Sequence, residues 1–156
     1  YGVSSGYTLV RDPQRTKFSY RDHLWQGSDL IATGIASFGH LSGVHYQNKA
    51  EWEEYVWDLA EGKLPLGRAL RPTRHQALIR EMILQLKKGR IDADYFKQKF
   101  DSDILSEWKT VWSQYQADGY LSIEGTEIII SREGLLRIDG LLPAFFEPEH
   151  QGIRYT

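Results

Sequence analysis

The segment DLIATGIASFGHLSGVHYQN, residues 29–48, joins an uncharged apolar run to a stretch of glycine, serine, histidine and aromatic residues. The apolar run covers residues 30–32 and continues at Ile35 and Ala36. This composition predicts a buried strand that leads into a closely packed loop. Because loops carried by buried strands hold much of the chemistry of α/β proteins, we expect a functional site of the chain to lie in this segment.

The composition of the whole chain is that of a globular protein. Its 156 residues are enough for one ordinary domain, with 41% hydrophobic and 26% charged residues. The formal net charge of −2 provides no excess of lysine and arginine for binding nucleic acid. No apolar run of about 18 residues occurs, so no membrane span is predicted, and a cytoplasmic location is expected. The absence of cysteine excludes disulfides, thiol nucleophiles and cysteine-bound clusters within this chain.

Helical patterns dominate the sequence after residue 48. Asn48 and Glu51 have the spacing of a capping box and predict a helix over residues 49–61. Thr73 and Gln76 form a second capping box, which predicts a helix that ends before Gly89. Residues 1–10 are expected to form a short strand or an extended arm. Further elements are expected as a loop over 11–25, helices over 93–100, 104–118 and 131–142, and a hairpin over 120–131.

A composition change separates the two halves of the chain. The stretch KLPLGRALRP, residues 63–72, contains two prolines and a glycine, and it is interpreted as a boundary between two units. Beyond this boundary the predicted order is three helices, a hairpin and a closing helix, which is the order of a winged-helix domain.

The third predicted helix of this domain disfavours binding to DNA. A recognition helix presents basic and amide side chains to the base edges. Here Asp103, Glu107 and Asp118 accompany Lys109, and the middle of the helix is aromatic and apolar. A winged-helix module that packs against other parts of a protein, or binds another protein, fits this composition better.

Other site types match the 29–48 segment less well. His40 and His45, with His23 upstream, have neither the spacing of a zinc site nor a carboxylate or thiolate beside them in the loop, so we expect them to form hydrogen bonds or to face a ligand carboxylate. Ser37 has no nucleophile-elbow pattern around it. The segment also lacks the spacing of phosphate-binding motifs, and its glycines are expected to provide positive φ and close backbone approach: Gly34, Gly39 and Gly43.

Six segments resemble a known family and keep its order along the chain. They are YGVSS (1–5), YRDHLWQGSDLIATGIASFGHLSG (20–43), HYQN (45–48), LPLGRALRPTRHQALIREMILQL (64–86), DGYLSIEG (118–125) and SREGLLRIDGLLPAFF (131–146). The first three resemble the end of the catalytic barrel in oxygen-independent coproporphyrinogen III oxidases, the HemN-type radical SAM enzymes. The last three resemble the winged-helix-like C-terminal domain of that family.

The resemblance implies a domain organisation. Residues 1–63 would be the C-terminal remnant of the radical SAM barrel, residues 64–148 a winged-helix-like domain, and residues 149–156 a tail. The expected fold class is α+β and mostly helical, with a barrel-end segment of strand, loop and helix before the winged-helix-like domain. The chain would be the C-terminal portion of a longer protein, and the N-terminal barrel would be its missing partner.

The resemblance also implies a function for the complete protein. The three-cysteine cluster motif of the family is absent here, so this chain alone is expected to hold no cofactor and to be inactive. With its [4Fe–4S] cluster and S-adenosylmethionine, the complete protein is expected to act on a porphyrin substrate, by oxidative decarboxylation of coproporphyrinogen III in haem biosynthesis. Haem chaperones and haem-degrading enzymes of the same family are alternatives, and a winged-helix interaction module is a further one.

The residues expected to bind ligand come from the same resemblance. Gln47 matches a family glutamine near the bound cofactor or substrate, and its amide can both donate and accept hydrogen bonds. Phe38 offers a flat apolar wall to a ring, and His40 and Arg68 are possible partners of substrate propionates. No catalytic residue and no metal ligand is assigned. The candidate binding residues are Ile35, Ala36, Ser37, Phe38, His40, Tyr46 and Gln47.

Overall fold

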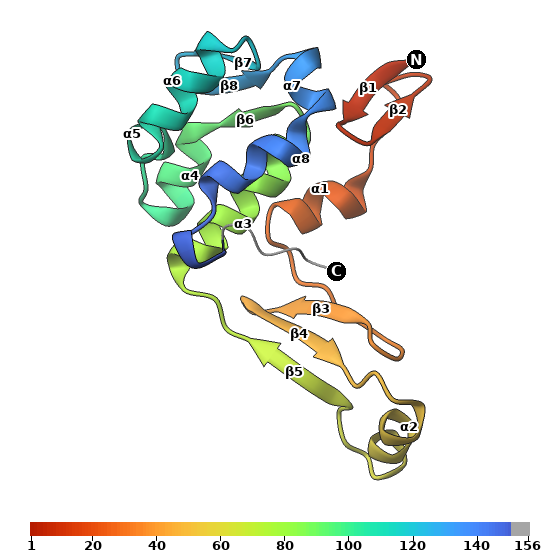
Figure 1. Ribbon diagram of the computed structural model, residues 1–156. Coiled ribbons are helices and arrows are strands. Elements are labelled where there is room, and N and C mark those ends of the chain that lie inside the picture. The colour runs from red at the N-terminus through yellow and green to blue at the C-terminus, as the bar shows by residue number, and fades with distance from the viewer. Residues whose placement is uncertain (151–156) are drawn as a thin grey trace. The chain divides into compact units, whose positions relative to one another are not determined.

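A computed structural model describes residues 1–150 of the chain, which divide into two compact units (Figure 1). The helical unit comprises residues 1–18 and those from Leu78 onward, and the sheet unit comprises Ser19–Ala77. The fold class is α+β, with more helix than strand, as predicted. The strands of residues 1–150 form three small sheets and no barrel. No helix in this part of the chain has the length and apolar composition needed to cross a bilayer.

The helical unit contains most of the regular structure. Its first segment is a hairpin of β1 (Gly2–Ser5) and β2 (Thr8–Val10). The remaining elements are α3 (Arg74–Leu86, whose first turn belongs to the sheet unit), β6 (Arg90–Asp92), α4 (Ala93–Phe100), α5 (Ile104–Glu107), α6 (Lys109–Ala117), β7 (Leu121–Glu124), β8 (Glu127–Ile130), α7 (Arg132–Leu136), α8 (Ile138–Leu141), and two short 3₁₀ helices at Leu142–Phe145 and Pro148–His150.

The antiparallel sheet of this unit has the order β6-β8-β7. The hairpin β7–β8 was predicted from its turn signal, and Gly125 in the turn has φ +64°, a value that glycine adopts without steric cost. No sequence pattern predicted β6, which pairs with β8 from Arg90↔Ile129 to Asp92↔Glu127. The third strand therefore joins the sheet from the connection between α3 and α4.

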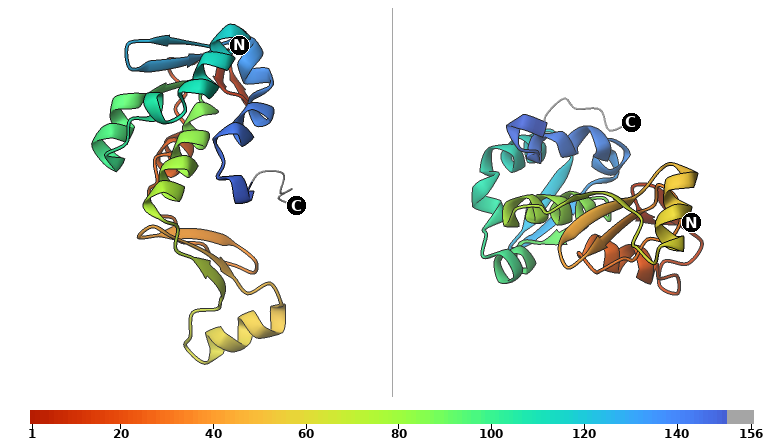
Figure 2. Two further views of the ribbon diagram at one scale, coloured as in Figure 1. Left: turned by 60° about the vertical axis from the view of Figure 1, so that its left-hand side comes forward. Right: turned by 90° about the horizontal axis from the view of Figure 1, so that it is seen from below.

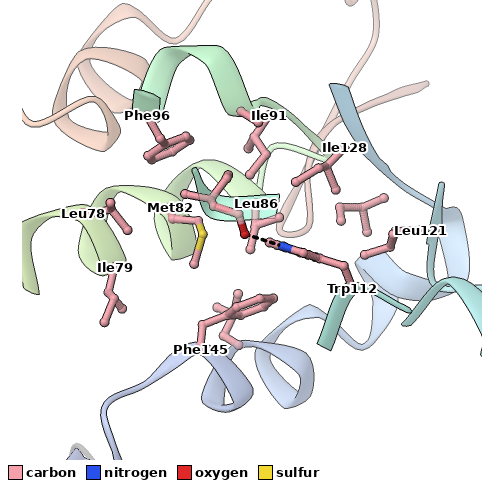
Figure 3. Close-up of a cluster of buried hydrophobic side chains, with 14 of the residues drawn as sticks. Leu78, Ile79, Met82, Leu86, Ile91, Phe96, Trp112, Leu121, Ile128 and Phe145 are labelled. Carbon is pink, nitrogen blue, oxygen red and sulfur yellow. Dashed lines mark hydrogen bonds between the residues drawn. The ribbon is translucent and has the colours of Figure 1, made fainter. Parts of the chain in front are cut away.

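A single hydrophobic core fills the helical unit (Figure 3). Met82 and Leu86 of α3, Phe96 of α4 and Ile128 of β8 are at most 1% exposed. Trp112 of α6 is also buried, and its indole Nε1 donates to the carbonyl of Ile104 at 2.8 Å. Each large apolar side chain buried in this way contributes about 1.5–3 kcal/mol to stability.

The N-terminal hairpin is attached to this unit by polar contacts. The amide of Gly6 donates to the carbonyl of Lys87 at 2.7 Å, and the hydroxyl of Tyr7 donates to the carboxylate of Asp139. The ammonium group of Lys87 lies 5.1 Å from the centre of the Tyr7 ring and 3.4 Å from Asp139. Burial, together with the hydrogen bond to Asp139, raises the pKa of Tyr7. Residues 1–10 thus form a hairpin that belongs to the helical unit.

Two of the predicted helices are interrupted. The helix expected over 104–118 breaks at Trp108, which has φ −108° and ψ 32°, into α5 and α6. Asp103 begins α5 by accepting hydrogen bonds from the amides of Leu105 and Ser106. The closing helix is capped by Ser131, as predicted, since the hydroxyl of this residue accepts from the amide of Gly134 at 3.1 Å. It continues as the separate short helices α7 and α8 and a 3₁₀ turn.

The predicted cap of α3 is confirmed. The amide of Gln76 donates to Thr73 Oγ1 at 3.1 Å, and the amide of Thr73 donates to Gln76 Oε1 at 3.0 Å. Both bonds satisfy backbone donors that a helix start leaves open. The helix ends before Gly89, which has φ +89°.

Replacing Thr73 with alanine is expected to lower the free energy of unfolding by about 1 kcal/mol, because an amide of the first turn of α3 loses its side-chain acceptor. Urea unfolding followed by far-UV circular dichroism measures the change. Thr110→Ala is the matched control, since Thr110 is exposed within α6. Equal stabilities of the two variants would show that the capping box does not stabilise α3.

The sheet unit contains α1 (Ser19–Trp25), β3 (Phe38–Leu41), β4 (Val44–Asn48), α2 (Trp52–Ala60) and β5 (Leu66–Leu70). The three strands form an antiparallel sheet in the order β3-β4-β5, and α2 connects β4 to β5 (Figure 1 and Figure 2). The loop predicted over 11–25 was wrong in its second half, where α1 forms. None of the buried hydrophobic core residues lies in this unit.

The division into units does not coincide with the predicted boundary between residues 63 and 64. The proline- and glycine-containing stretch 63–72 contains β5, which pairs with β4 from His45↔Leu70 to Asn48↔Leu66. Strand pairing therefore holds this stretch in the sheet unit. Of the predicted tail, residues 149 and 150 close the second 3₁₀ helix, and residues 151–156 lie outside the described part of the chain.

Candidate functional site

The apolar run of the 29–48 segment is a loop, and the predicted buried strand was wrong. Leu30 forms an isolated bridge with His40, but no strand covers residues 31–37. Ile31 is 72% exposed. Gly34 and Ala36 have φ values of +99° and +55°, which an extended strand does not allow. The chain therefore turns repeatedly between residues 31 and 37.

The strands lie instead in the part that was predicted as loop. β3 and β4 form a hairpin with the pairs Phe38↔Gln47 and Leu41↔Val44. Ser42 and Gly43 connect the strands with φ values of +50° and +78°, as in a type I′ turn. The positive φ expected at glycines of this segment is thus confirmed for Gly34 and Gly43.

Side chains from β4 and α2 hold the loop in place. The side-chain Nδ2 of Asn48 donates to the carbonyls of Gly34 at 3.0 Å and Ala32 at 3.3 Å. The amide of Ala32 donates to the hydroxyl of Tyr46 at 2.9 Å, and that of Gly34 donates to the hydroxyl of Tyr55 at 3.0 Å. Backbone groups of Ala32 and Gly34 are therefore paired by side chains, as the backbone of a packed loop requires.

Asn48 thus does not cap a helix, and the first predicted capping box was wrong. Asn48 is 5% exposed, and its side chain is hydrogen-bonded to the loop. Helix α2 begins at Trp52, and its N-cap residue Glu51 makes no side-chain capping bond. The sequence pattern matched a capping box, but the helix begins four residues after Asn48, and the side-chain Nδ2 of Asn48 donates to the loop.

Gln47 links the loop to β5. Its Nε2 donates to the carbonyl of Ala36 at 2.9 Å, and its Oε1 accepts from Nε of Arg68 at 2.7 Å. The amide of Ala36 donates to the carbonyl of Lys49 at 2.9 Å. Ala36 is a non-glycine residue with positive φ, a conformation that costs about 1–2 kcal/mol. The two bonds to Ala36 hold the backbone in that conformation.

One face of the sheet brings together three of the seven predicted binding residues, Phe38, His40 and Gln47. Directly paired residues of neighbouring strands point to the same face. The pairs Phe38↔Gln47 and Gln47↔Arg68 place these three side chains on one face, and the pairs of His45 with His40 and Leu70 continue it. We refer to this surface as the Phe38 face: Phe38, His40, His45, Gln47, Arg68 and Leu70.

Aromatic rings stack on the Phe38 face. The rings of Phe38 and His45 are nearly parallel, with centroids 5.7 Å apart and an interplanar angle of 12°. Phe38 is 51% exposed, whereas His40 is 7% exposed. The ring of His40 lies 6.4 Å from that of His45 at an angle of 46°.

Tyr46 lies on the opposite face of the sheet. A Cβ atom at Gly39 would lie 2.2 Å from Cζ of Tyr46, so the ring needs glycine beneath it. Gly39 therefore allows the ring of Tyr46 to lie close to the backbone, as expected for the glycines of this segment. The predicted binding residues therefore fall into three places: Phe38, His40 and Gln47 on the Phe38 face, Tyr46 on the other face, and Ile35, Ala36 and Ser37 in the loop. Within the loop, Ser37 Oγ donates to the carbonyl of Thr33 at 2.9 Å.

Two residues of the site were missed at the sequence level. Asn48 was interpreted as a helix cap, and Tyr55 was counted with the apolar face of α2 because of its spacing. Both are identified only by their partners in the loop, 14 and 21 residues away. A single sequence carries no signal for such pairs, since helical periodicity reports the direction of a side chain and not its partner.

The residues of the chain do not fit an iron–sulfur cluster. The cluster of a radical SAM protein needs cysteine thiolates, and the chain contains no cysteine. The potential metal-binding group found among residues 1–150 is Glu147, Glu149 and His150 in the helical unit, and it involves no residue of the Phe38 face.

Comparison with known proteins gives a likeness to a solved structure. No protein-family model matches the sequence, and no curated protein sequence matches it. Among solved structures, the fold is similar to that of coproporphyrinogen III oxidase (HemN) from Escherichia coli, described as a radical SAM enzyme, with a TM-score of 0.65 and 20% identity. The likeness covers 76% of this chain and 28% of that enzyme. The resemblance to a HemN-type protein that the sequence predicted is therefore confirmed at the level of the fold, for a chain that spans less than a third of the enzyme's length.

Proposed function

We propose that the chain is the C-terminal part of a HemN-like radical SAM protein, and that the complete protein acts on a porphyrinogen by oxidative decarboxylation of coproporphyrinogen III. The observation that carries this proposal is the likeness in fold to HemN over 76% of the chain. The sequence segments that resemble the family support it, because they occur in the family's order within the same chain.

The sheet unit supports a place within a larger domain. Its small sheet has no buried apolar core of its own, while several large apolar side chains are more than half exposed: Ile31, Trp52, Trp57, Leu64 and Leu70. A three-stranded sheet is stable when one of its faces packs against other structure, and large exposed apolar side chains mark such packing surfaces. We propose that residues 1–63, of which residues 19–63 lie in the sheet unit, are the end of a radical SAM barrel, and that the remaining barrel covers exposed apolar side chains of this unit.

The part of the helical unit from Leu78 onward supports the winged-helix-like domain proposed for residues 64–148. Its elements run in the order α3, β6, α4, α5 with α6, β7 and β8, and the strands pair as β6-β8-β7. The domain therefore consists of a helix followed by a strand, then two helical segments, and then a hairpin whose strands complete the sheet with β6. The core residues come from every one of these parts, so the domain has the packing of an independent unit.

The role of this chain in the reaction of the complete protein is to bind and position ligands. The [4Fe–4S] cluster would need cysteines from elsewhere in the complete protein, so we assign no chemical step to residues of this chain. The loop of residues 31–37 provides small side chains that let a ligand approach the backbone. Phe38 provides an exposed ring, and the bonds of Gln47 to Ala36 and Arg68 fix the loop and the neighbouring guanidinium. S-adenosylmethionine and the porphyrinogen are the proposed ligands.

The test uses the complete protein, purified without oxygen and with its cluster reconstituted. We expect it to form 5′-deoxyadenosine from S-adenosylmethionine and to release carbon dioxide from coproporphyrinogen III as two propionates become vinyl groups. The chain of 156 residues alone is expected to do neither. Absence of 5′-deoxyadenosine would contradict the radical SAM assignment. Its formation together with haem binding or haem breakdown, but no decarboxylation, would favour a haem chaperone or a haem-degrading relative.

A further inference from the structure

The three-stranded sheet is free of acidic residues. β3, β4 and β5 contain no aspartate or glutamate, whereas they contain His40, His45 and Arg68. All three of these side chains belong to the Phe38 face. An anion at this face would therefore meet the exposed cation of Arg68 without repulsion from a carboxylate of the sheet.

The side chain of Arg68 is exposed, and its guanidinium group is held in one orientation. Its Nε donates to Oε1 of Gln47 at 2.7 Å, and no carboxylate within residues 1–150 forms an ion pair with it. A bond through Nε fixes the plane of the guanidinium and leaves its two terminal nitrogens for another partner. These two nitrogens match the two oxygens of a carboxylate, the geometry that arginine recognises best.

A flat apolar surface lies beside this cation. Gln47 of β4 pairs with Phe38 of β3 on one side and with Arg68 of β5 on the other. Phe38 and Arg68 therefore flank the same glutamine. Phe38 is stacked on His45 on one side and is 51% exposed. An exposed ring supported in this way can stack with the ring system of a ligand.

We propose that Arg68 binds a carboxylate of a flat ring ligand that stacks near Phe38, with Gln47 as the residue that orients the guanidinium. This inference rests on the proposed function and adds the anchoring group of the site. Two ligands of that function share the required chemistry. The methionyl carboxylate of S-adenosylmethionine accompanies its adenine ring, and the propionates of a porphyrin substrate accompany its tetrapyrrole ring.

The test compares Arg68→Met and Arg68→Lys with the matched control Arg71→Met in the complete protein. Arg71 is exposed and lies just beyond the end of β5. Dissociation constants are measured for coproporphyrin III by fluorescence, for its tetramethyl ester, and for S-adenosylmethionine by equilibrium dialysis. Circular dichroism establishes that each variant folds as the unaltered protein does.

Loss of a charge-assisted bidentate contact is expected to weaken the binding of one of the two carboxylate ligands by about tenfold or more in Arg68→Met, with a smaller loss in Arg68→Lys. Arg71→Met should stay within about twofold. Weaker binding of coproporphyrin III but not of its ester identifies a propionate as the partner, and weaker binding of S-adenosylmethionine alone identifies the methionyl carboxylate.

Unchanged affinity of Arg68→Met for both ligands would overturn the inference, as would an equal loss for coproporphyrin III and its ester. Either result leaves the proposed function intact where the unaltered protein still cleaves S-adenosylmethionine and decarboxylates coproporphyrinogen III. Failure of the unaltered protein in those two reactions is the separate outcome that contradicts the proposed function.

Discussion

Replacing Phe145 with alanine is expected to lower the free energy of unfolding of the helical unit by about 3–5 kcal/mol. The residue is 2% exposed, and its ring centroid lies 4.6 Å from that of Trp112 and 6.1 Å from those of Trp108 and Tyr115. Truncation removes apolar contact area and leaves a cavity among large rings that cannot readily collapse into it. Urea unfolding followed by tryptophan fluorescence and far-UV circular dichroism measures the loss.

The matched control for this variant is Leu136→Ala. Leu136 lies in α7 and is 73% exposed, so its truncation should change the free energy of unfolding by no more than about 0.5 kcal/mol. A loss below about 1 kcal/mol for Phe145→Ala would mean that this aromatic cluster is not a tightly packed part of the core.

The helical unit was predicted well where its determinants are local. The apolar stripe of α3 is confirmed, since Ile79, Met82 and Leu86 are buried and Ile83 packs against the core. The cap of the same helix involves residues three positions apart, and the turn of the β7–β8 hairpin depends on Gly125. Patterns of this range are complete within a short window of sequence, so a single sequence is enough to recognise them.

The missed features of this unit depend on distant partners. β6 is three residues long and exists because it pairs with β8, which follows three intervening helices. The break at Trp108 in the helix predicted over 104–118 likewise occurs without a proline or glycine that would predict it. Its ring lies against Phe145, which belongs to a different part of the chain. Tertiary contacts override helix propensity at such positions.

The sequence predicts a candidate site in residues 29–48, but it did not predict the structure of this segment. Composition and family resemblance both pointed to residues 29–48, and Phe38 and Gln47 lie together on one face. The apolar run before them was assigned to a buried strand because apolar residues are expected to be buried. In the sheet unit no such core exists, and the positive φ of Ala36 is held by hydrogen bonds from Gln47 and to Lys49. Neither determinant is visible in a local pattern.

Replacing Gln47 with alanine in the complete protein is expected to reduce kcat/KM by about tenfold or more, through the loss of two hydrogen bonds worth about 0.5–1.5 kcal/mol each and of the arrangement that they hold. The substitution releases the carbonyl of Ala36, which its Nε2 contacts at 2.9 Å, and the guanidinium of Arg68. Steady-state kinetics measure the loss of activity, and hydrogen exchange of residues 30–37 measures the release of the loop.

Gln47→Glu separates the two contacts of this side chain. A carboxylate still accepts from Nε of Arg68, but it cannot donate to the carbonyl of Ala36 and repels that oxygen. Faster exchange of the loop is therefore expected in both Gln47 variants and not in Arg68→Met, where the bond to Ala36 remains. Gln114→Ala, on the exposed side of α6, is the matched control. If the loop exchanges faster in Gln47→Glu while ligand affinity and activity stay unchanged, the loop does not face the ligand, and the contribution of Gln47 to the site is confined to Arg68.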